Sequence, residues 1–199
     1  MAIEHNVITD AERHEPKGLS TALNGQVYLA RGSDTGAWVY LPVGWGYYAD
    51  NTAGQTVNTV ASKLSVNGLG SASESGYLPR EIRGSSELWD TSADKITPIA
   101  AGDTYNIQLQ LPITADTGTP TVLDIALDIG GAATPSNIQT ARDISVSKSP
   151  PYTVSVGFPI FCLATFITNG GQFFLSTDTG TVTIVGATIL IDRNTSGAI

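Results

Sequence analysis

Apolar residues recur at every second position in much of this chain, and this spacing predicts strands rather than helices. In TVLDIALDI, the apolar residues Leu123, Ile125, Leu127 and Ile129 alternate with Asp and Ala, and the segment 105–111 repeats the pattern. Successive side chains of a strand point to opposite faces, so a period of two indicates one buried and one solvated face. Most of the chain is therefore predicted to form half-buried strands.

Two further segments, VGFPIFCLATFI (156–167) and VTIVGATILI (182–191), are apolar at nearly every position. A strand with this composition is predicted to be covered on both faces, by the core and by a second surface. A monomer would leave one of these faces in water, so we expect a subunit interface.

Turn-forming residues separate the predicted strands. The sequence contains 21 Gly and 10 Pro, and the segments 169–171 (NGG) and 177–180 (TDTG) have the composition of tight turns. Eight or nine short strands with this spacing suit a jelly-roll sandwich. We therefore predict an all-β fold, with the jelly roll over residues 43–199.

Residues 1–42 differ from the rest of the chain. The first 20 residues carry both histidines and mixed charge without a sustained apolar period, which is typical of an arm that buries no face by itself. The segments QVYLAR (26–31) and AWVYL (37–41) then flank GSDTG, a pattern that predicts a small β-hairpin.

Charge and hydrophobicity exclude some partners. The chain has 18 acidic and 10 basic residues, a formal charge of −8, which would repel nucleic acid. The most hydrophobic run, 154–167, is shorter than the ~20 residues of a membrane-spanning helix, so no membrane partner is expected. The single cysteine, Cys162, lies among apolar residues and predicts a buried thiol in a protein made in a reducing cytoplasm.

No defensible catalytic group emerges from the sequence. Asp34, Asp116 and Asp178 each begin an Asp-Thr-Gly triplet, as in aspartic proteases, but they lie between predicted strands and are interpreted as turns. A serine hydrolase would require His5 or His14 as its base, and both lie in the arm. We predict that the protein is not an enzyme.

Metal binding is not expected either. His5, His14 and Cys162 have no metal-ligand spacing, and Asp124 and Asp128 lie on the solvated face of a predicted strand, ~13 Å apart. We therefore predict no metal and no cofactor, with calcium at loop aspartates as the open alternative.

Exposed aromatic residues are candidates for sugar binding. The alternative interpretation, and the commoner role of such residues, is that they are core or interface anchors. The five candidates are Trp45, Tyr47, Tyr48, Tyr77 and Trp89.

Two parts of the sequence resemble a known family. HEPKG followed by GQVYLARGSDTGAWVYLP resembles the N-terminal segment of many tailed-bacteriophage virion proteins. LWDTSADKITPIAAGDTYNIQLQLPI and GGQFFLSTDTGTVTIVGATILIDRN are similar to the trimeric tumour-necrosis-factor-like (TNF-like) jelly roll that those proteins carry. The resemblance covers nearly the whole chain, but its jelly-roll part is a fold shared by many functions.

This resemblance implies a homotrimeric decoration protein, also called a cement or head-fibre protein, on the outer capsid surface of a virion. Such a protein is synthesised in the bacterial host cytoplasm. The arm would bind the major capsid protein through His14, Glu15, Pro16, Lys17 and Gly18. Pro16 favours an extended Glu15, and Gly18 permits a sharp exit. Two alternatives remain: the arm packs on its own jelly roll, or the protein is a tail fibre that recognises a host surface glycan.

Overall fold

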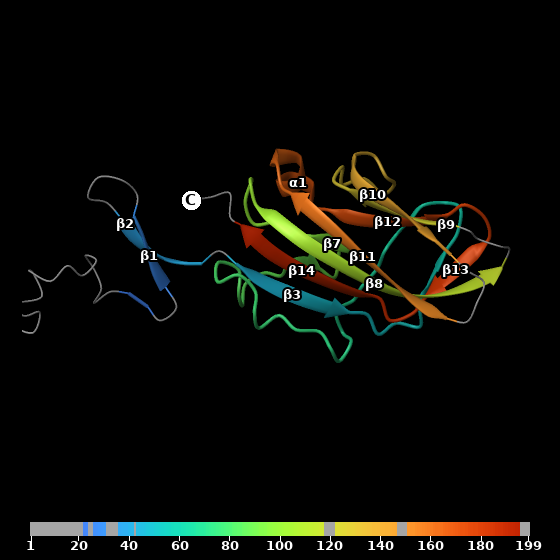
Figure 1. Ribbon diagram of the computed structural model, residues 1–199, viewed down its shortest axis with the longest axis horizontal. Helices are drawn as coiled ribbons and strands as arrows, with labels where there is room; N and C mark the ends of the chain where they lie inside the picture. Colours follow the sequence, from blue (N-terminus) through green and yellow to red (C-terminus); the bar gives the residue numbers. More distant parts are fainter. Residues whose placement is uncertain are drawn as a thin grey trace, which may run out of the picture. The chain divides into compact units, whose positions relative to one another are not determined.

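The computed structural model describes residues 22–23, 26–30, 36–41, 43–117, 122–146 and 151–195 (Figure 1). The chain divides into two compact units, Met1–Leu41 and Pro42–Ile199.

The first unit contains an antiparallel hairpin of β1 (Gln26–Ala30) and β2 (Gly36–Tyr40). Tyr28 pairs with Trp38 across the hairpin, and their rings meet edge to face with centroids 5.3 Å apart. Gly36 is required beside them, because a Cβ at this position would lie 2.4 Å from the Tyr28 ring. The hairpin predicted from the sequence is confirmed.

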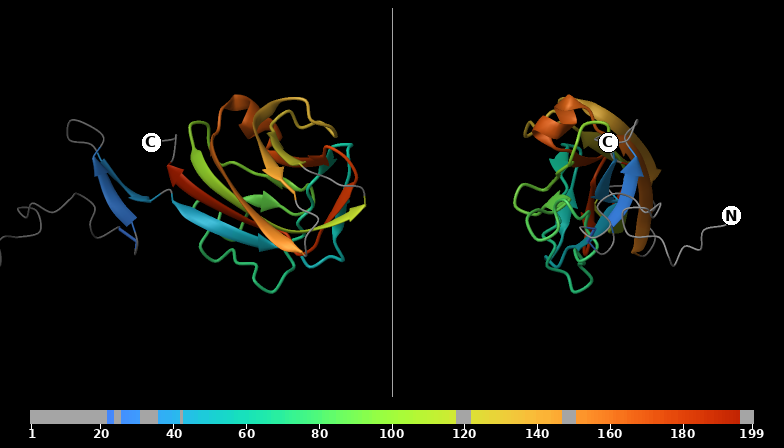
Figure 2. Two further views of the ribbon diagram at one scale, coloured as in Figure 1. Left: turned by 45° about the vertical axis from the view of Figure 1, so that its right-hand side comes forward. Right: turned by 90° about the vertical axis from the view of Figure 1, so that its left-hand side faces the viewer.

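The second unit consists mainly of two antiparallel sheets that face each other (Figure 2). The strands of the first sheet are β3 (Gly44–Ala49), β4 (Gln55–Val57), β8 (Thr104–Thr117), β11 (Tyr152–Phe161), β13 (Thr181–Ile184) and β14 (Thr188–Thr195). Those of the second are β5 (Ser62–Lys63), β9 (Val122–Asp128), β10 (Ile138–Ser145) and β12 (Gln172–Thr177). Three small elements complete the unit: β6 (Trp89–Asp90), β7 (Lys95–Ile96) and α1 (Ala164–Asn169).

The order of the strands is that of a jelly roll. Across the first sheet the order is β3-β14-β8-β11. Beyond the part of β8 that pairs with β14, β8 pairs with β13, and β13 pairs in turn with β4. Across the second sheet it is β5-β12-β9-β10. Strands that are neighbours in a sheet are therefore mostly distant in sequence, as in a double Greek key. The predicted all-β jelly-roll class is confirmed.

The hydrophobic core lies between the two sheets. On β8 the odd-numbered residues from Tyr105 to Ile113 are buried, and on β9 Leu123, Ile125 and Leu127 are buried. Phe158 of β11 contacts Phe173 of β12 across the core, with ring centroids 5.1 Å apart. Each such side chain contributes about 1.5–3 kcal/mol on burial. The alternation seen in the sequence is thus the inward–outward alternation of these two strands.

The second covered face predicted for 156–167 and 182–191 is not formed within one subunit, so coverage by another subunit stays a prediction. On β11, buried and exposed residues alternate, and Ser155, Gly157 and Pro159 point outward. Small residues and proline had counted as apolar although they offer little apolar surface. In addition, residues 164–169 form the short helix α1, in which Phe166 is buried.

Candidate interaction surfaces

The arm residues predicted to bind the capsid, His14, Glu15, Pro16, Lys17 and Gly18, lie outside the described residues. The same holds for His5 and for Asp34.

The other two Asp-Thr-Gly triplets lie near strand ends. Asp178 follows β12 in a turn, and its Oδ1 accepts a hydrogen bond from the backbone N–H of Val122 at 3.1 Å, as a turn residue would. Asp116 instead lies within β8, is exposed, and accepts a hydrogen bond from the Thr183 hydroxyl. The turn prediction is confirmed for Asp178 and wrong for Asp116, because β8 continues to Thr117.

Cys162 is a core residue. Its side chain is fully buried, and burial, followed by the nearby Asp103 carboxylate, raises the pKa of the thiol to about 12. Asp103 is itself buried and forms a 2.9 Å ion pair with Arg193 Nη2, while Tyr105 Oη donates to its other oxygen at 2.9 Å. Arg193 also contacts Glu81 at 2.9 Å. This network joins the beginning of β8 to the end of β14, and the buried thiol lies beside it.

Asp128 is not on a solvated face, contrary to the prediction. It is fully buried at the end of β9 and accepts hydrogen bonds from the backbone N–H groups of Gly130 at 2.9 Å, Ser136 at 2.7 Å and Asn137. The β9–β10 loop folds over the carboxylate and supplies the donors that a buried charge requires.

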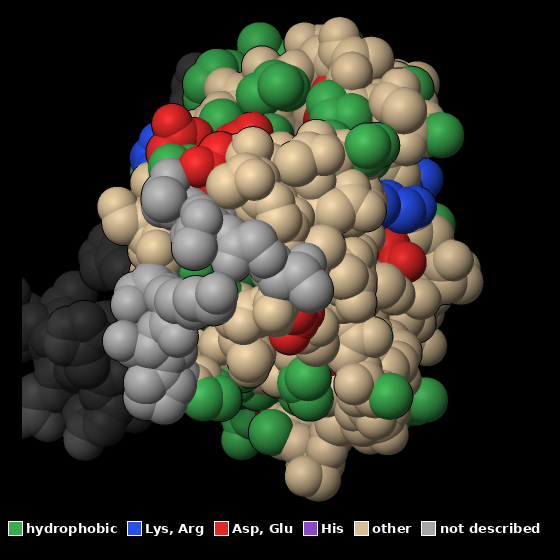
Figure 3. Space-filling view, turned by 90° about the vertical axis from the view of Figure 1, so that its right-hand side faces the viewer, with side chains coloured by type: hydrophobic (Ala, Val, Ile, Leu, Met, Phe, Trp, Pro, Cys, Tyr) green, Lys and Arg blue, Asp and Glu red, His purple; other side chains and the backbone are tan. Residues whose placement is uncertain are grey.

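Acidic and basic side chains are sparse on the end of the jelly roll seen in Figure 3, where they lie among neutral and hydrophobic groups. Within the described ranges, no three His, Cys, Asp or Glu side chains are arranged to hold a metal ion. No helix in that part of the chain has the length and apolar character to cross a bilayer.

The candidate sugar-binding aromatics separate into two groups. Tyr48 and Trp89 are buried: Tyr48 Oη donates to Glu87 Oε2 at 2.9 Å, and Trp89 Nε1 donates to the Val66 carbonyl at 2.9 Å. These two are core anchors. The remaining three reach the surface; they are Trp45, Tyr47 and Tyr77.

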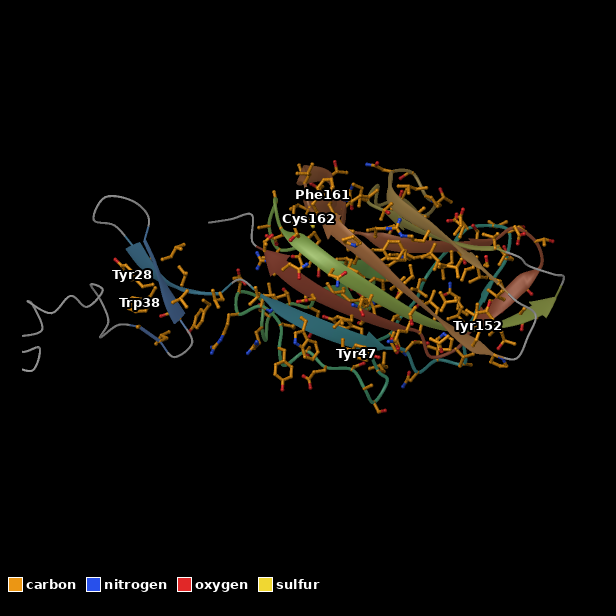
Figure 4. The ribbon with its side chains drawn as sticks, in the orientation of Figure 1. Tyr28, Trp38, Tyr47, Tyr152, Phe161 and Cys162 are labelled. Atoms are coloured by element: carbon orange, nitrogen blue, oxygen red, sulfur yellow. The ribbon has the colours of Figure 1, made fainter. Side chains whose placement is uncertain are left out.

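A long connection between β5 and β6 folds back along the edge of β3. Tyr47 and Glu74 exchange backbone hydrogen bonds of 2.9 and 2.8 Å, and the Trp45 N–H donates to the Tyr77 carbonyl at 3.0 Å. The Trp45 and Tyr77 rings stack with centroids 4.9 Å apart. This pairing places Glu74 beside Tyr47, which Figure 4 shows on β3.

Three hollows in series follow this connection, and together we call them the β3 groove. The first, about 450 Å³, is lined by Trp45, Tyr47, Ala72, Glu74, Leu190 and Asp192. The second, about 230 Å³, shares Tyr47 and Glu74 with the first. The third, about 320 Å³, shares Glu87 and Thr91 with the second. No feature of the sequence identified Glu74, Glu87 or Asp90 as lining residues.

The central part of the solvent-facing side of β8, β11 and β14, called the outer face below, is nearly free of charge. In the central register, Leu190 of β14 lies beside Gln108 of β8, which lies beside Gly157 of β11. In the next row, Asp192 is followed by Asn106 and Pro159. The outer face is defined by Asn106, Gln108, Gln110, Ser155, Gly157, Pro159, Leu190 and Asp192.

An exposed hydrophobic group, called the apolar edge, lies where β10 begins and β11 ends. Ile138, Phe161 and Leu163 are 53%, 57% and 60% exposed, respectively. The Gln139 Nε2 donates to the Phe161 carbonyl at 2.8 Å, which holds the two strand ends together. Figure 4 shows Phe161 at the end of β11 near α1.

No protein-family model and no curated protein matches this chain. Among solved structures, it is similar to PRD1 vertex protein P5, with 13% identity, a TM-score of 0.47, and coverage of 75% of this chain and 96% of that one. It is also similar to Eiger TNF from S. frugiperda, with 11% identity, a TM-score of 0.43, and coverage of 79% and 96%. A chain from maize chlorotic mottle virus has 10% identity, a TM-score of 0.29, and coverage of 78% and 96%. Likeness at this level assigns no function.

Proposed function

We propose that this protein is a viral structural protein, a homotrimer that binds the outer surface of a bacteriophage capsid and stabilises the shell. The observation that carries the proposal is that one subunit has a nearly uncharged outer face that is bordered by an exposed apolar edge, where Phe161 continues the outward row of β11. Two different surfaces of one subunit that fit each other form a heterologous contact, which repeats until a ring closes.

The chemistry of the two surfaces supports this contact. Interface cores are depleted in charged residues, and the outer face carries only one, Asp192. Exposed groups such as Phe161 and Leu163 lose unfavourable contact with water when a neighbour covers them. The apolar edge of one subunit would pack on the outer face of the next. Three subunits are proposed because the sequence resembles trimeric TNF-like jelly rolls.

Attachment to the shell is assigned to the arm, on the resemblance of its sequence to phage virion proteins. His14, Glu15, Pro16, Lys17 and Gly18 would contact the major capsid protein. A trimer presents three arms, so the second and third contacts form at high effective concentration and each can be weak. Binding only to the assembled shell stabilises that shell by mass action. We propose no catalytic role and no cofactor.

The trimer is tested by Gly157→Arg. A Cβ on Gly157 would meet only the Ile107 carbonyl, 4.0 Å away, so a monomer accommodates a long side chain there, whereas a covered outer face would not. We expect light scattering to give the mass of one subunit for Gly157→Arg and of three for wild type. Ala141→Arg, at an exposed position of β10 on the opposite sheet, is the control and should remain trimeric. A monomeric wild type would refute the proposal.

Attachment is tested by combining Pro16→Ala with Lys17→Glu. The double variant should loosen the extended turn and reverse a charge, with a cost of ~1–3 kcal/mol per arm if Lys17 is paired and desolvated. We expect that the double variant does not co-sediment with capsids that lack the native protein. Its trimer mass and melting temperature should be those of wild type. Wild-type occupancy would remove this stretch from the contact. Early melting would instead favour an arm packed on its own jelly roll.

A tail fibre or receptor-binding protein is the second candidate, and the β3 groove is the observation that favours it. Copy number separates the two roles. Hundreds of copies per purified virion would support decoration of the shell, whereas a few to a few tens would support a tail fibre.

A further inference from the structure

Three carboxylates of the β3 groove, on Glu74, Glu87 and Asp90, are each held by one oxygen. The Gly76 N–H donates to Glu74 Oε1 at 2.6 Å, and Tyr48 Oη donates to Glu87 Oε2 at 2.9 Å. Asp90 Oδ1 accepts from the N–H and hydroxyl of Ser92 and from the Ala93 N–H, at 2.7 to 3.0 Å.

The second oxygen of each carboxylate makes no hydrogen bond to the described part of the chain. One oxygen of each is therefore available as an acceptor, and the bond to the other limits its movement. Acceptors oriented in advance reduce the entropy lost when a ligand binds.

The same groove offers hydrogen-bond donors and an aromatic wall. Its lining includes the hydroxyls of Ser75, Ser86 and Thr91 and the amide of Asn67. Tyr47 lines the first two hollows, and Trp45 lines the first, where stacking on Tyr77 orients its indole. None of the described residues that line the three hollows is a lysine or an arginine.

We propose that the β3 groove binds a neutral oligosaccharide. Sugar rings need all three features of this lining: acceptors for their hydroxyl protons, donors for their ring and hydroxyl oxygens, and an apolar surface for their C–H faces. A metal ion or a polyamine would use only the acceptors. A sialylated or sulfated glycan would be repelled by the four carboxylates that line the hollows, those of Glu74, Glu87, Asp90 and Asp192, because no cationic residue lines them in the described part of the chain.

The arrangement of the hollows indicates a chain of sugars rather than a single ring. Each hollow shares two lining residues with the next, and their volumes of about 450, 230 and 320 Å³ follow one another along the connection from β5 to β6. Single ligand pockets are commonly ~300–1,000 Å³. All residues that line the three hollows belong to one subunit, so a monomer can hold the ligand. Leu190 and Asp192 of the first hollow are also part of the outer face.

The experiment uses the full chain on an array of neutral, sialylated and sulfated oligosaccharides, followed by calorimetry with the best neutral ligand. We expect binding to neutral glycans, a quench or shift of tryptophan emission, and at least a tenfold loss of affinity in Glu74→Gln and in Tyr47→Ala. Asp143→Asn removes one charge from the opposite sheet and should bind as wild type does. Gly157→Arg should also bind, which separates this site from the trimer.

The proposal is overturned if no neutral glycan binds, if sialylated or sulfated glycans bind more tightly, or if only spermine or Ca²⁺ binds. It is also overturned if Glu74→Gln retains the affinity of wild type. Glu74 is exposed and Gln has nearly the same shape, so this variant stays informative should Tyr47→Ala fail to fold.

Discussion

At the scale of residues, Asp124 and Asp143 face each other across β9 and β10. Like charges directly opposite in an antiparallel pair are unfavourable. Burial, and then the neighbouring Asp143 carboxylate, raises the pKa of Asp124 above its ordinary value. The ionised pair therefore opposes folding at neutral pH, although both residues lie on a well-formed strand pair.

The sign of the pH dependence follows. A carboxyl group whose pKa is raised by folding favours the fold while it is protonated, below its unfolded value of about 3.9, and that contribution is lost as pH rises through the folded pKa. We expect Asp143→Asn to melt above wild type at about pH 7 and to lose this advantage near pH 4. Thermal denaturation across that range measures it. An advantage that is constant with pH would show that charge is not the cause.

Sequence alone could not sort these carboxylates. Asp124 and Asp128 occupy the same apparent face of one strand, yet only Asp128 is fully buried. The difference arises from residues 130–137, which fold over Asp128 and donate to it. Likewise, Tyr48 and Tyr47 are adjacent in sequence but lie in the core and in the groove, respectively. The local sequence pattern predicts which residues of a strand alternate between its two faces. Whether the outward residues are buried depends on the loop that covers them.

At the scale of elements, Gly170 ends α1 and begins the return into β12. Its φ of 78° and ψ of −178° fall where residues other than glycine are rare, and a Cβ would lie 2.6 Å from the Ile96 carbonyl oxygen. That oxygen accepts the Gly171 N–H at 3.1 Å, so the strand cannot move away freely.

We expect Gly170→Ala to lower the free energy of unfolding by more than the ~1–3 kcal/mol of backbone strain alone. Urea denaturation provides the measurement. Gly84→Ala is the control, because Gly84 has a φ of 81° and no atom within 4 Å of its Cβ position, so it isolates the strain. Equal losses in the two variants would mean that the clash with Ile96 has no weight.

Periodicity predicted β8 well because one face of this strand lies in the core and the other in water. It also identified the core residues of β9, although Ala126 and Asp128 on the other side of β9 are buried as well. It failed for 164–169, where α1 follows directly on an apolar strand. A helix of six residues contains fewer than two turns, which is too short for a helical period to be visible. Composition also did not show that the small residues of β11 point outward, because it does not tell which way a side chain points.

At the scale of the whole molecule, the proposed trimer contact lies entirely within residues 42–199. Deleting residues 1–41 is therefore expected to leave the trimer mass and the melting temperature unchanged. Analytical ultracentrifugation at micromolar concentration measures the first and calorimetry the second. A truncated protein that becomes monomeric would move the subunit contact into the arm.

The jelly-roll class could be predicted from strand number and turn spacing, but the β3 groove could not. Glu74 and Tyr47 meet through a connection that has little regular secondary structure, and the two residues are far apart in sequence. Such a contact leaves no period or motif, because it depends on where a loop returns and not on the composition of the loop.

The pairing of β3 with β14 also sets the order of events during synthesis. β3 is made early, yet its neighbour in the sheet comprises residues 188–195. At the usual rates of translation this partner leaves the ribosome on the order of ten seconds later. The β9–β10 hairpin can form during that interval, since its contacts are local. The first sheet has to wait for β14, so subunits could meet through the outer face only after residues 188–195 have left the ribosome.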